Sequence, residues 1–163
     1  MKKDNIEGRC FEMTEEDFSR VRQIWSAGTK EAHSFITEEW SEYWSNAKGN
    51  FEKELINLLN ERYVWKIDGE VVGFMLAQRR RNNHAYIFEL YVDKDRRRGG
   101  IGTKLIKELK KRYSSLAWHV YEQNTFIEFH KSKKLGFKIH KKTLCKYTRF
   151  PKLYMEWTEG EKD

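Results

Sequence analysis

The sequence predicts a mixed α/β (α+β) fold in which a mostly antiparallel sheet is flanked by helices. Short runs of β-branched and aromatic residues alternate with longer segments whose apolar residues recur at helical spacing. Asp68-Gly69 separates two β-rich runs, which is a strong hairpin signal. A glycine-rich turn at 97–102 joins a strand to a helix. The length of 163 residues is that of one domain, so we expect a single domain across residues 1–163.

The first strand and the first helix are expected before residue 30. Residues 8–13 alternate weakly between polar and apolar side chains, as a short strand does. Thr14 is suited to be the N-cap of a helix whose first turn is acidic. Four apolar side chains then share one face of this helix: Phe18, Val21, Ile24 and Trp25. Gly28 is expected to end the helix.

Two more helical stretches are expected before the hairpin. Residues 32–36 form a bridge, after which Thr37 can cap a second helix that carries Trp40 and Trp44. A third stretch at 51–59 is rich in Phe, Leu and Ile. The apolar residues in both stretches indicate amphipathic helices.

The hairpin is followed by the central strand of the predicted sheet. Its two strands are expected at 63–67 and 71–76, and a polar connection follows at 78–84. Residues 86–92 are dense in aromatic and branched side chains, as in a buried strand. After the glycine-rich turn, a helix carries Leu105, Ile106 and Leu109 on its apolar side.

Four short elements complete the expected order. They are a strand at 117–121, a short helix that starts at Phe126, and strands at 137–139 and 153–157. The chain therefore reads as one strand, several helices, a hairpin and a central strand, followed by a helix, a strand, a second helix and a final strand pair.

Composition limits the classes of partner. The chain has 32 Lys and Arg against 25 Asp and Glu, a net charge of +7 and a pI near 9.3, which favours anionic partners. We interpret these charges as spread along the chain, without a basic tail that would argue for DNA. Cys10 and Cys145 lack metal-ligand spacing and are interpreted as free thiols in a reducing cytosol. No signal peptide or membrane-length apolar run is visible, so a cytoplasmic protein is expected.

The turn from Arg97 to Gly102 is the most informative motif. The first turn of a helix has unpaired N–H groups and the positive end of the dipole, so it attracts phosphate. Glycines let a diphosphate approach the backbone, and arginines add charge. No Gly-Lys-Ser/Thr follows, which excludes a Walker A loop, and Leu105 stands where a Rossmann fingerprint needs its third glycine. On the motif alone, an ordinary strand-to-helix turn with a solvated basic flank is equally consistent.

Arg97-x-x-Gly100-x-Gly102, after the strand Leu90-Tyr91-Val92, resembles the acetyl-CoA signature of the GNAT superfamily of N-acetyltransferases. Asn124 and Leu135-Gly136-Phe137 resemble the second block of that family. Trp25, His33, Phe35 and Ile36 resemble a Trp…His-x-Phe-Ile pattern on the acceptor side of a branch of small bacterial members. Tyr154-Met155-Glu156-Trp157 resembles the last strand, so the likeness covers a core of about residues 8–157.

The resemblance implies the GNAT acyl-CoA N-acyltransferase fold, in which the central strand and the next one splay apart around the cofactor. It implies direct transfer of the acetyl group of acetyl-CoA to a primary amine in a ternary complex, without a metal. The acceptor is then a small molecule, a peptide N-terminus or a protein lysine, among which the sequence does not choose. A monomer and a homodimer are both consistent with the sequence.

Two groups of cofactor contacts are implied by the resemblance. The backbone of Tyr91 and Val92 is expected to bond the pantetheine arm as an added strand does, although both positions also fit plain sheet core. The glycine-rich turn is expected to hold the pyrophosphate through Arg97, Arg98, Gly99, Gly100, Ile101, Gly102 and Thr103. Asn124 fits a helix N-cap and a cofactor contact, and the resemblance favours the contact.

The catalytic residues are less defined, because the sequence departs from the family pattern. Many members place a Tyr in the second block as proton donor to the thiolate. Depending on the alignment, His130 or Ser132 occupies that position here. We favour His130 because imidazole titrates near neutrality, and a solvated helix face explains both residues equally well. Candidate bases are Glu89 and His33, with structural roles or a water chain as alternatives.

The acceptor pocket is expected to include Trp25, His33 and Phe35 within the aromatic segment 25–44. Two rival functions remain. One is a non-catalytic acyl-CoA-binding module of the same fold, which has lost its acid. The other is a basic nucleic-acid-binding protein, which ranks last because no recognition motif is present.

Overall fold

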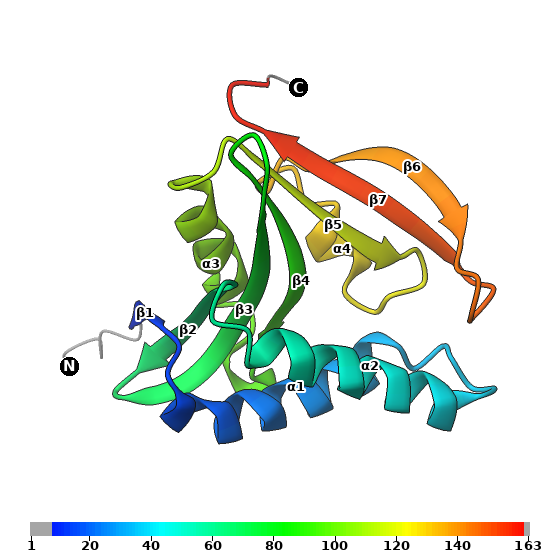
Figure 1. Ribbon diagram of the computed structural model, residues 1–163, viewed down its shortest axis with the longest axis horizontal. Helices are drawn as coiled ribbons and strands as arrows, with labels where there is room; N and C mark the ends of the chain where they lie inside the picture. Colours follow the sequence, from blue (N-terminus) through cyan, green and yellow to red (C-terminus); the bar gives the residue numbers. More distant parts are fainter. Residues whose placement is uncertain (1–7, 162–163) are drawn as a thin grey trace.

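The computed structural model describes residues 8–161 and contains one seven-stranded sheet (Figure 1). The strand order is β1-β2-β3-β4-β5-β7-β6. The strands are β1 (Arg9–Glu12), β2 (Glu61–Ile67), β3 (Glu70–Arg80), β4 (His84–Val92), β5 (Ser115–Tyr121), β6 (Lys138–Leu144) and β7 (Pro151–Thr158). Every neighbouring pair is antiparallel except β4 and β5, which are parallel. The mixed, mostly antiparallel fold predicted from the sequence is therefore confirmed.

Helices cover both faces of the sheet. On one face, α1 (Phe18–Ala32) and α2 (Trp40–Leu55) enclose a core that includes Val64, Phe74 and Leu76. On the other face, α3 (Ile101–Lys110) packs on the alternate residues of the same strands, and the short α4 (Ile127–His130) contacts β5. Figure 1 shows the β6–β7 pair extending away from the β1–β4 part of the sheet. No helix within residues 8–161 is long and apolar enough to cross a bilayer.

The first helix departs from the sequence-based prediction at both ends. Thr14 caps a separate 3₁₀ turn (Glu15–Asp17) through a capping box with Asp17, and α1 starts one turn later than expected. At the other end, α1 continues through Gly28 to Ala32. A Cβ at Gly28 would lie 2.4 Å from the ring of Tyr91, so this glycine permits close packing of α1 on β4 and does not end the helix.

The two helical stretches expected between residues 37 and 59 are one helix, α2. Thr37 does not cap it, because Glu39, with a positive φ of 55°, is the residue before its first turn. The apolar side chains of α2 form one continuous stripe at helical spacing: Trp40, Trp44, Ala47, Phe51 and Leu55. Leu58 and Leu59, expected in the third stretch, lie beyond the helix and are exposed.

The connection expected at 78–84 is mostly strand. β3 continues to Arg80 and β4 begins at His84, so only three residues turn the chain. Asn82 and Asn83 both adopt positive φ, which asparagine tolerates better than most residues. The polar composition of this segment reflects two exposed strand ends, and not a longer loop.

β4 and β5 part soon after they meet. They pair at only three positions, where His84 to Tyr86 face Ser115 to Ala117. β4 continues to Val92 and β5 to Tyr121 without further pairing between them. The splayed strand pair that the resemblance implies is therefore present in the structure.

Substitution of Gly28 by Ala tests the packing of α1 on β4. We expect Gly28→Ala to lower the free energy of unfolding by about 1–3 kcal/mol, because the added Cβ overpacks the contact with Tyr91. Gly49→Ala is the matched control in α2, where a Cβ meets nothing within 4 Å. That variant should gain up to about 1 kcal/mol from helix propensity. Urea denaturation measures both, and equal effects would contradict the packing role of Gly28.

Candidate active site

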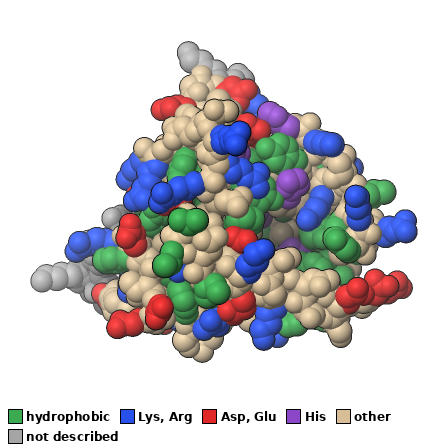
Figure 2. Space-filling model, viewed as in Figure 1, with side chains coloured by type: hydrophobic (Ala, Val, Ile, Leu, Met, Phe, Trp, Pro, Cys, Tyr) green, Lys and Arg blue, Asp and Glu red, His purple; other side chains and the backbone are tan. Residues whose placement is uncertain are grey.

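The parting of β4 and β5 opens a cleft of about 1710 Å³. Its lining comes from the α1–α2 connection, one side of α2, the free edge of β4, the turn before α3 and its first residues, β5, α4 and the β6–β7 connection. Figure 2 shows the molecule hollowed on this face, with histidine and hydrophobic side chains at the edge of the hollow. The lining includes every residue expected to bind the cofactor except Gly99.

The turn before α3 has the geometry of an anion site. Arg98 and Gly100 both have positive φ, at 70° and 77°, and α3 begins at Ile101. The N–H of Lys104 is the first to bond back to the carbonyl of Gly100, so the preceding N–H groups lack helical partners. A Cβ at Gly100 would meet nothing within 4 Å, whereas one at Gly102 would lie 3.0 Å from the Phe129 ring. Gly100 therefore keeps the approach to these N–H groups open, and Gly102 lets α4 pack on α3.

Arg97 makes three contacts inside the protein, to Val92, Glu31 and Phe126. Its Nε donates to the carbonyl of Val92 at 3.2 Å, and its guanidinium forms an ion pair with Glu31 at 2.8 Å. The same guanidinium lies over the ring of Phe126, 4.7 Å from its centroid. Arg97 therefore ties α1 and the segment before α4 to the end of β4, and its charge is already paired. Arg98, which is exposed, is the arginine of the turn that faces solvent.

A β-bulge in β4 determines which side chains face the cleft. Leu76 of β3 is opposite Glu89, but Ala77 is opposite Ile87, so Phe88 is an extra residue. Ile87 points into the core beneath α3. Because side chains alternate along a strand, Glu89 would follow Ile87 onto that face without the bulge. The bulge instead turns Glu89 toward α1 and the cleft.

Glu89 lies in an environment that disfavours its charge. Burial raises its pKa to about 8. The indole of Trp25 has a smaller, opposite effect on this pKa, because it favours the charged form. Trp25 itself is only 3% exposed, stacks on Phe51 at 4.4 Å and does not line the cleft. The structure thus places Trp25 in the core behind Glu89, and not in the acceptor pocket expected from the sequence.

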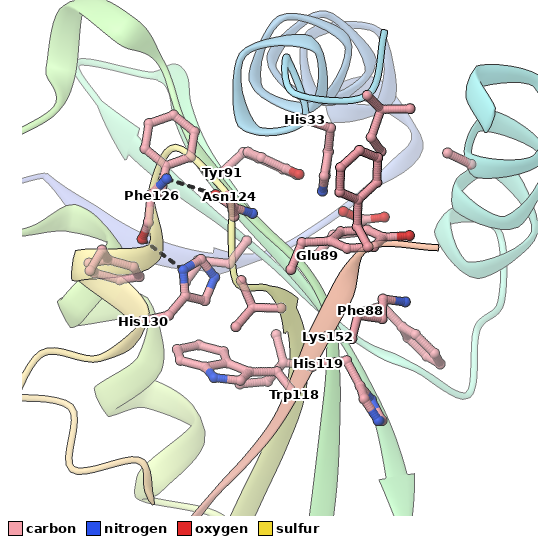
Figure 3. Close-up of a pocket in the computed structure, with 18 of the residues that line it drawn as sticks. His33, Phe88, Glu89, Tyr91, Trp118, His119, Asn124, Phe126, His130 and Lys152 are labelled. Carbon is pink, nitrogen blue, oxygen red and sulfur yellow. Dashed lines mark hydrogen bonds between the residues drawn. The ribbon is translucent and has the colours of Figure 1, made fainter. Parts of the chain in front are cut away.

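His33 faces the cleft as a neutral imidazole, at the residue that follows α1. Its Nδ1 donates to the carbonyl of Thr29 at 3.0 Å, which leaves Nε2 as an acceptor. Burial lowers its pKa to about 4; the hydrogen bond to Thr29 opposes this shift, and the positive charge of Lys152 adds a smaller part to it. Figure 3 shows its ring extending from α1 toward the part of the cleft where Glu89 lies. Phe35, by contrast, packs on Tyr121 and Phe150 and is not part of the lining.

His130 and Ser132 both line the cleft, on α4 and just after it. The Nδ1 of His130 donates to the carbonyl of Phe126 at 2.9 Å, and burial lowers its pKa. A neutral imidazole with this bond presents Nε2 as an acceptor, which is the opposite of what a general acid needs. The geometry therefore argues against the acid role favoured for His130, whereas the hydroxyl of Ser132 keeps its proton.

Asn124 combines the two roles considered for it. It is 7% exposed, and its Oδ1 accepts the N–H of Phe126 at 2.7 Å, which closes the turn before α4. Figure 3 shows its amide at the surface of the cleft, between Tyr91 and His130. One end of the side chain therefore supports the backbone, and the other can donate to a ligand.

Three cleft residues were not predicted from the sequence. Tyr43 projects from α2, and burial, followed by the fields of Tyr121, Tyr91 and Glu89, raises its pKa, so its phenol stays protonated. Tyr121 donates to Cys145 Sγ at 3.3 Å, and Lys152 Nζ lies 4.9 Å above the Tyr121 ring. No sequence motif marks these positions, since the fold alone brings α2 and the β6–β7 connection to β5.

No metal site accompanies these groups in the part of the chain that the structure describes. Within residues 8–161, no three His, Cys, Asp or Glu side chains are arranged to hold an ion. The unpaired edge of β4 and the N–H groups before α3 suit an extended chain that ends in phosphates. The residues present therefore fit a CoA-type ligand.

A family model described as "Acetyltransferase (GNAT) family" matches residues 13–137. The fold is similar to ribosomal-protein-S18-alanine N-acetyltransferase from Escherichia coli, with a TM-score of 0.67, 19% identity and 96% of each chain covered. It is also similar to YjaB from Escherichia coli (TM-score 0.71, 23% identity, 91% of this chain and 95% of the other). PaiA N-acetyltransferase from Thermoplasma acidophilum, in complex with coenzyme A, has a TM-score of 0.68 and 21% identity, with coverage of 92% and 98%. No curated protein sequence matches the chain.

The two cysteines should differ in reactivity. Burial works against ionisation of Cys145, but hydrogen bonds from Thr148 and Tyr121 outweigh it and lower its pKa to about 7. Burial raises the pKa of Cys10 to about 11. We expect iodoacetamide at neutral pH to alkylate Cys145 well before Cys10, because the thiolate is the nucleophile. Peptide mass spectrometry over time measures this order, with Thr148→Val expected to slow Cys145. Faster labelling of Cys10 would contradict the assignment.

Proposed function

The chain belongs to the GNAT acetyltransferase family, and we propose that it transfers the acetyl group of acetyl-CoA to a primary amine while both substrates occupy the cleft. One observation carries this proposal. The unpaired edge of β4 and the open N-terminus of α3 face the same cleft, beside an acidic residue whose carboxylate is shielded from water. We propose that the domain spans residues 8–157, because β1 and β7 belong to the same sheet as the matched region.

Two parts of the chain are proposed to hold acetyl-CoA. The N–H groups of residues 98–103 would bind the phosphates, with Gly100 leaving room for their approach. Backbone groups of Tyr91 and Val92 would bond the pantetheine arm along the free edge of β4. When bound, acetyl-CoA supplies an acyl group activated as a thioester. The residues of the protein then have to orient the amine and manage two protons.

We propose Glu89 as the general base. An aliphatic amine is protonated at neutral pH, with a pKa near that of lysine, about 10.4. A carboxylate whose pKa is about 8 accepts this proton more readily than an ordinary glutamate. His33 is the weaker candidate, because a pKa of about 4 makes its Nε2 a poor proton acceptor. Its neutral ring is better suited to orient the acceptor.

For the leaving thiolate, we propose a stabilising hydrogen bond from a hydroxyl group in place of a proton from an imidazolium. His130 is held neutral with Nδ1 bonded to Phe126, so it positions α4 beside Trp118. The hydroxyls of Ser132 and Tyr43 remain protonated across the working pH range and both line the cleft. Glu89 also distinguishes an enzyme from a CoA-binding module, since a shielded carboxylate has no role in cofactor binding alone.

Titration calorimetry with acetyl-CoA, followed by a thiol-release assay on a panel of amines, tests the proposal directly. Binding with CoA release that depends on an amine is expected. Binding without turnover on any amine would favour the non-catalytic module, and strong, salt-dependent binding to a DNA oligomer without binding of acetyl-CoA would favour a nucleic-acid-binding protein.

Gly100→Ala should weaken CoA binding more than about tenfold, which corresponds to about 1.4 kcal/mol. The added Cβ strains a backbone with a φ of 77° and enters the space in front of the free N–H groups. Gly69→Ala is the matched control, because Gly69 has a φ of 78° and equally open surroundings in the β2–β3 turn. Calorimetry should find its affinity within about twofold of the original protein. Equal affinities of both variants for CoA would contradict the assignment of the phosphate site to this turn.

Glu89→Gln should lower kcat by about 10²–10⁴-fold, the usual contribution of a general base, with CoA affinity retained. In the original protein, kcat/KM should rise with pH through an apparent pKa near 8, because Glu89 must be ionised to accept the proton. That limb should be absent in Glu89→Gln. Glu159→Gln, an exposed position outside the cleft, is the control. An unchanged pH profile in Glu89→Gln would assign the base elsewhere.

A further inference from the structure

The positive charge of the chain is concentrated in one segment, contrary to the even distribution expected from the sequence. Residues 129–155 contain nine of the 32 Lys and Arg and no Asp or Glu, which leaves 23 cations against 25 acids elsewhere. This segment includes the end of α4, β6 and the first part of β7. It forms the wall of the cleft on the β5 side, so the whole cationic excess lies on one side of the site.

Three of these cations, Lys134, Arg149 and Lys152, line the cleft, and of the three only Lys152 is half-buried. Lys138 and Lys142 form ion pairs with Glu161 and Glu122, at 3.7 and 2.9 Å. Lys152 is half-buried, lines the cleft and makes no ion pair with a carboxylate of residues 8–161. Figure 3 shows its side chain extending from β7 into the space between the parted strands.

The charge of Lys152 acts on the acceptor part of the cleft. It lies over Tyr121, whose ring is 5.6 Å from that of His33. After burial, which is the main cause, Lys152 is among the charges that lower the pKa of both His33 and His119. The ammonium group therefore shares one chamber with the imidazole that precedes the α1–α2 connection.

Glu89 lies on the opposite side of this chamber. Tyr43 also lines this chamber, and after burial the fields of Tyr121, Tyr91, Glu89 and Cys145 raise the pKa of its phenol. Glu89 and Lys152 do not pair with each other. Lys152 is on β7, which pairs with β5, and β5 separates from the strand of Glu89, β4. The chamber consequently has an acidic pole on β4 and a basic pole on β7.

A half-buried ammonium without a carboxylate partner is costly to keep. Contact with the face of Tyr121 offsets only part of the cost of taking this charge out of water. An anion bound from solution would provide the missing partner. A polyamine or another multiply cationic acceptor would instead place like charge against Lys152.

We propose that the acceptor is a primary amine that carries a carboxylate, as an amino acid does. Its amine would lie at Glu89 and His33, and its carboxylate would bind Lys152. This inference rests on the proposed N-acetyltransferase function and specifies the class of acceptor for the same cleft.

Amines that differ only by a carboxylate provide the test. We would measure acetyl transfer from acetyl-CoA to tyrosine and tyramine, phenylalanine and phenethylamine, and lysine and cadaverine. The original protein should prefer the carboxylate-bearing member of a pair. Lys152→Gln should lower kcat/KM for that member by about 10- to 100-fold, the value of one charge-assisted bond, mainly through KM. The decarboxylated partner should change by less than about twofold.

Lys146→Gln is the matched control, because it removes the same charge from an exposed position outside the cleft. Lys152→Glu should reverse the preference toward the decarboxylated amine. Equal use of both members of every pair, or an equal effect of Lys152→Gln on both, would overturn the inference and leave the N-acetyltransferase function intact. If the protein binds acetyl-CoA but acetylates no amine, both proposals fall.

Discussion

The separation of β4 from β5 is the constraint on which the rest of the structure depends. After three paired positions, the edge of β4 loses its neighbour, and backbone groups that a sheet would satisfy face a cleft. Unpaired backbone polar groups are tolerated only where water or a ligand replaces the lost partner. Contacts of the segments around the gap keep β4 and β5 apart. Arg97 connects α1 and the segment before α4 to Val92, and Gly102 lets Phe129 pack on α3. A binding edge for an extended ligand is thus a structural consequence of the fold.

The close packing of α1 on β4 also shapes the surroundings of Glu89. Gly28 brings α1 against Tyr91, and the extra residue at Phe88 turns Glu89 toward the cleft. Trp25, stacked on Phe51, closes the core beneath Glu89 and excludes water from one side of its carboxylate. The bulge and the close packing of α1 together bury the Glu89 carboxylate, and burial raises its pKa to about 8 against the smaller, opposite effect of the Trp25 indole. None of these three features touches a substrate, yet each determines what Glu89 can do.

The sequence predicted the order of the strands along the chain, the hairpin at Asp68-Gly69 and the glycine-rich turn, because these depend on local patterns. It failed where a residue acts through a distant contact. Gly28 has the local appearance of a helix end, but its role is set by Tyr91 on another element. Arg97 matches the cofactor signature, but nothing local indicates its ion pair with Glu31 on α1. Trp25 matches an acceptor-side pattern, and only the packing of α2 shows it to be core. The bulge at Phe88 leaves no sequence signal at all, since it appears only in the register with β3.

The same separation explains why a carboxyl group and an ammonium group lie in one cleft without pairing with each other. In a continuous sheet, Glu89 on β4 and Lys152 on β7 would be only two strands apart, with β5 between them. Side chains of this length on the same face could then approach each other and neutralise their charges, which would remove both from chemistry. Because β4 has moved away from β5, the two groups stand on opposite walls, and neither forms an ion pair with a side chain of residues 8–161. A molecule that carries an amine and a carboxylate can neutralise both at once, whereas an amine alone neutralises only one. The geometry that exposes the backbone of β4 therefore also sets the charge pattern of the cleft.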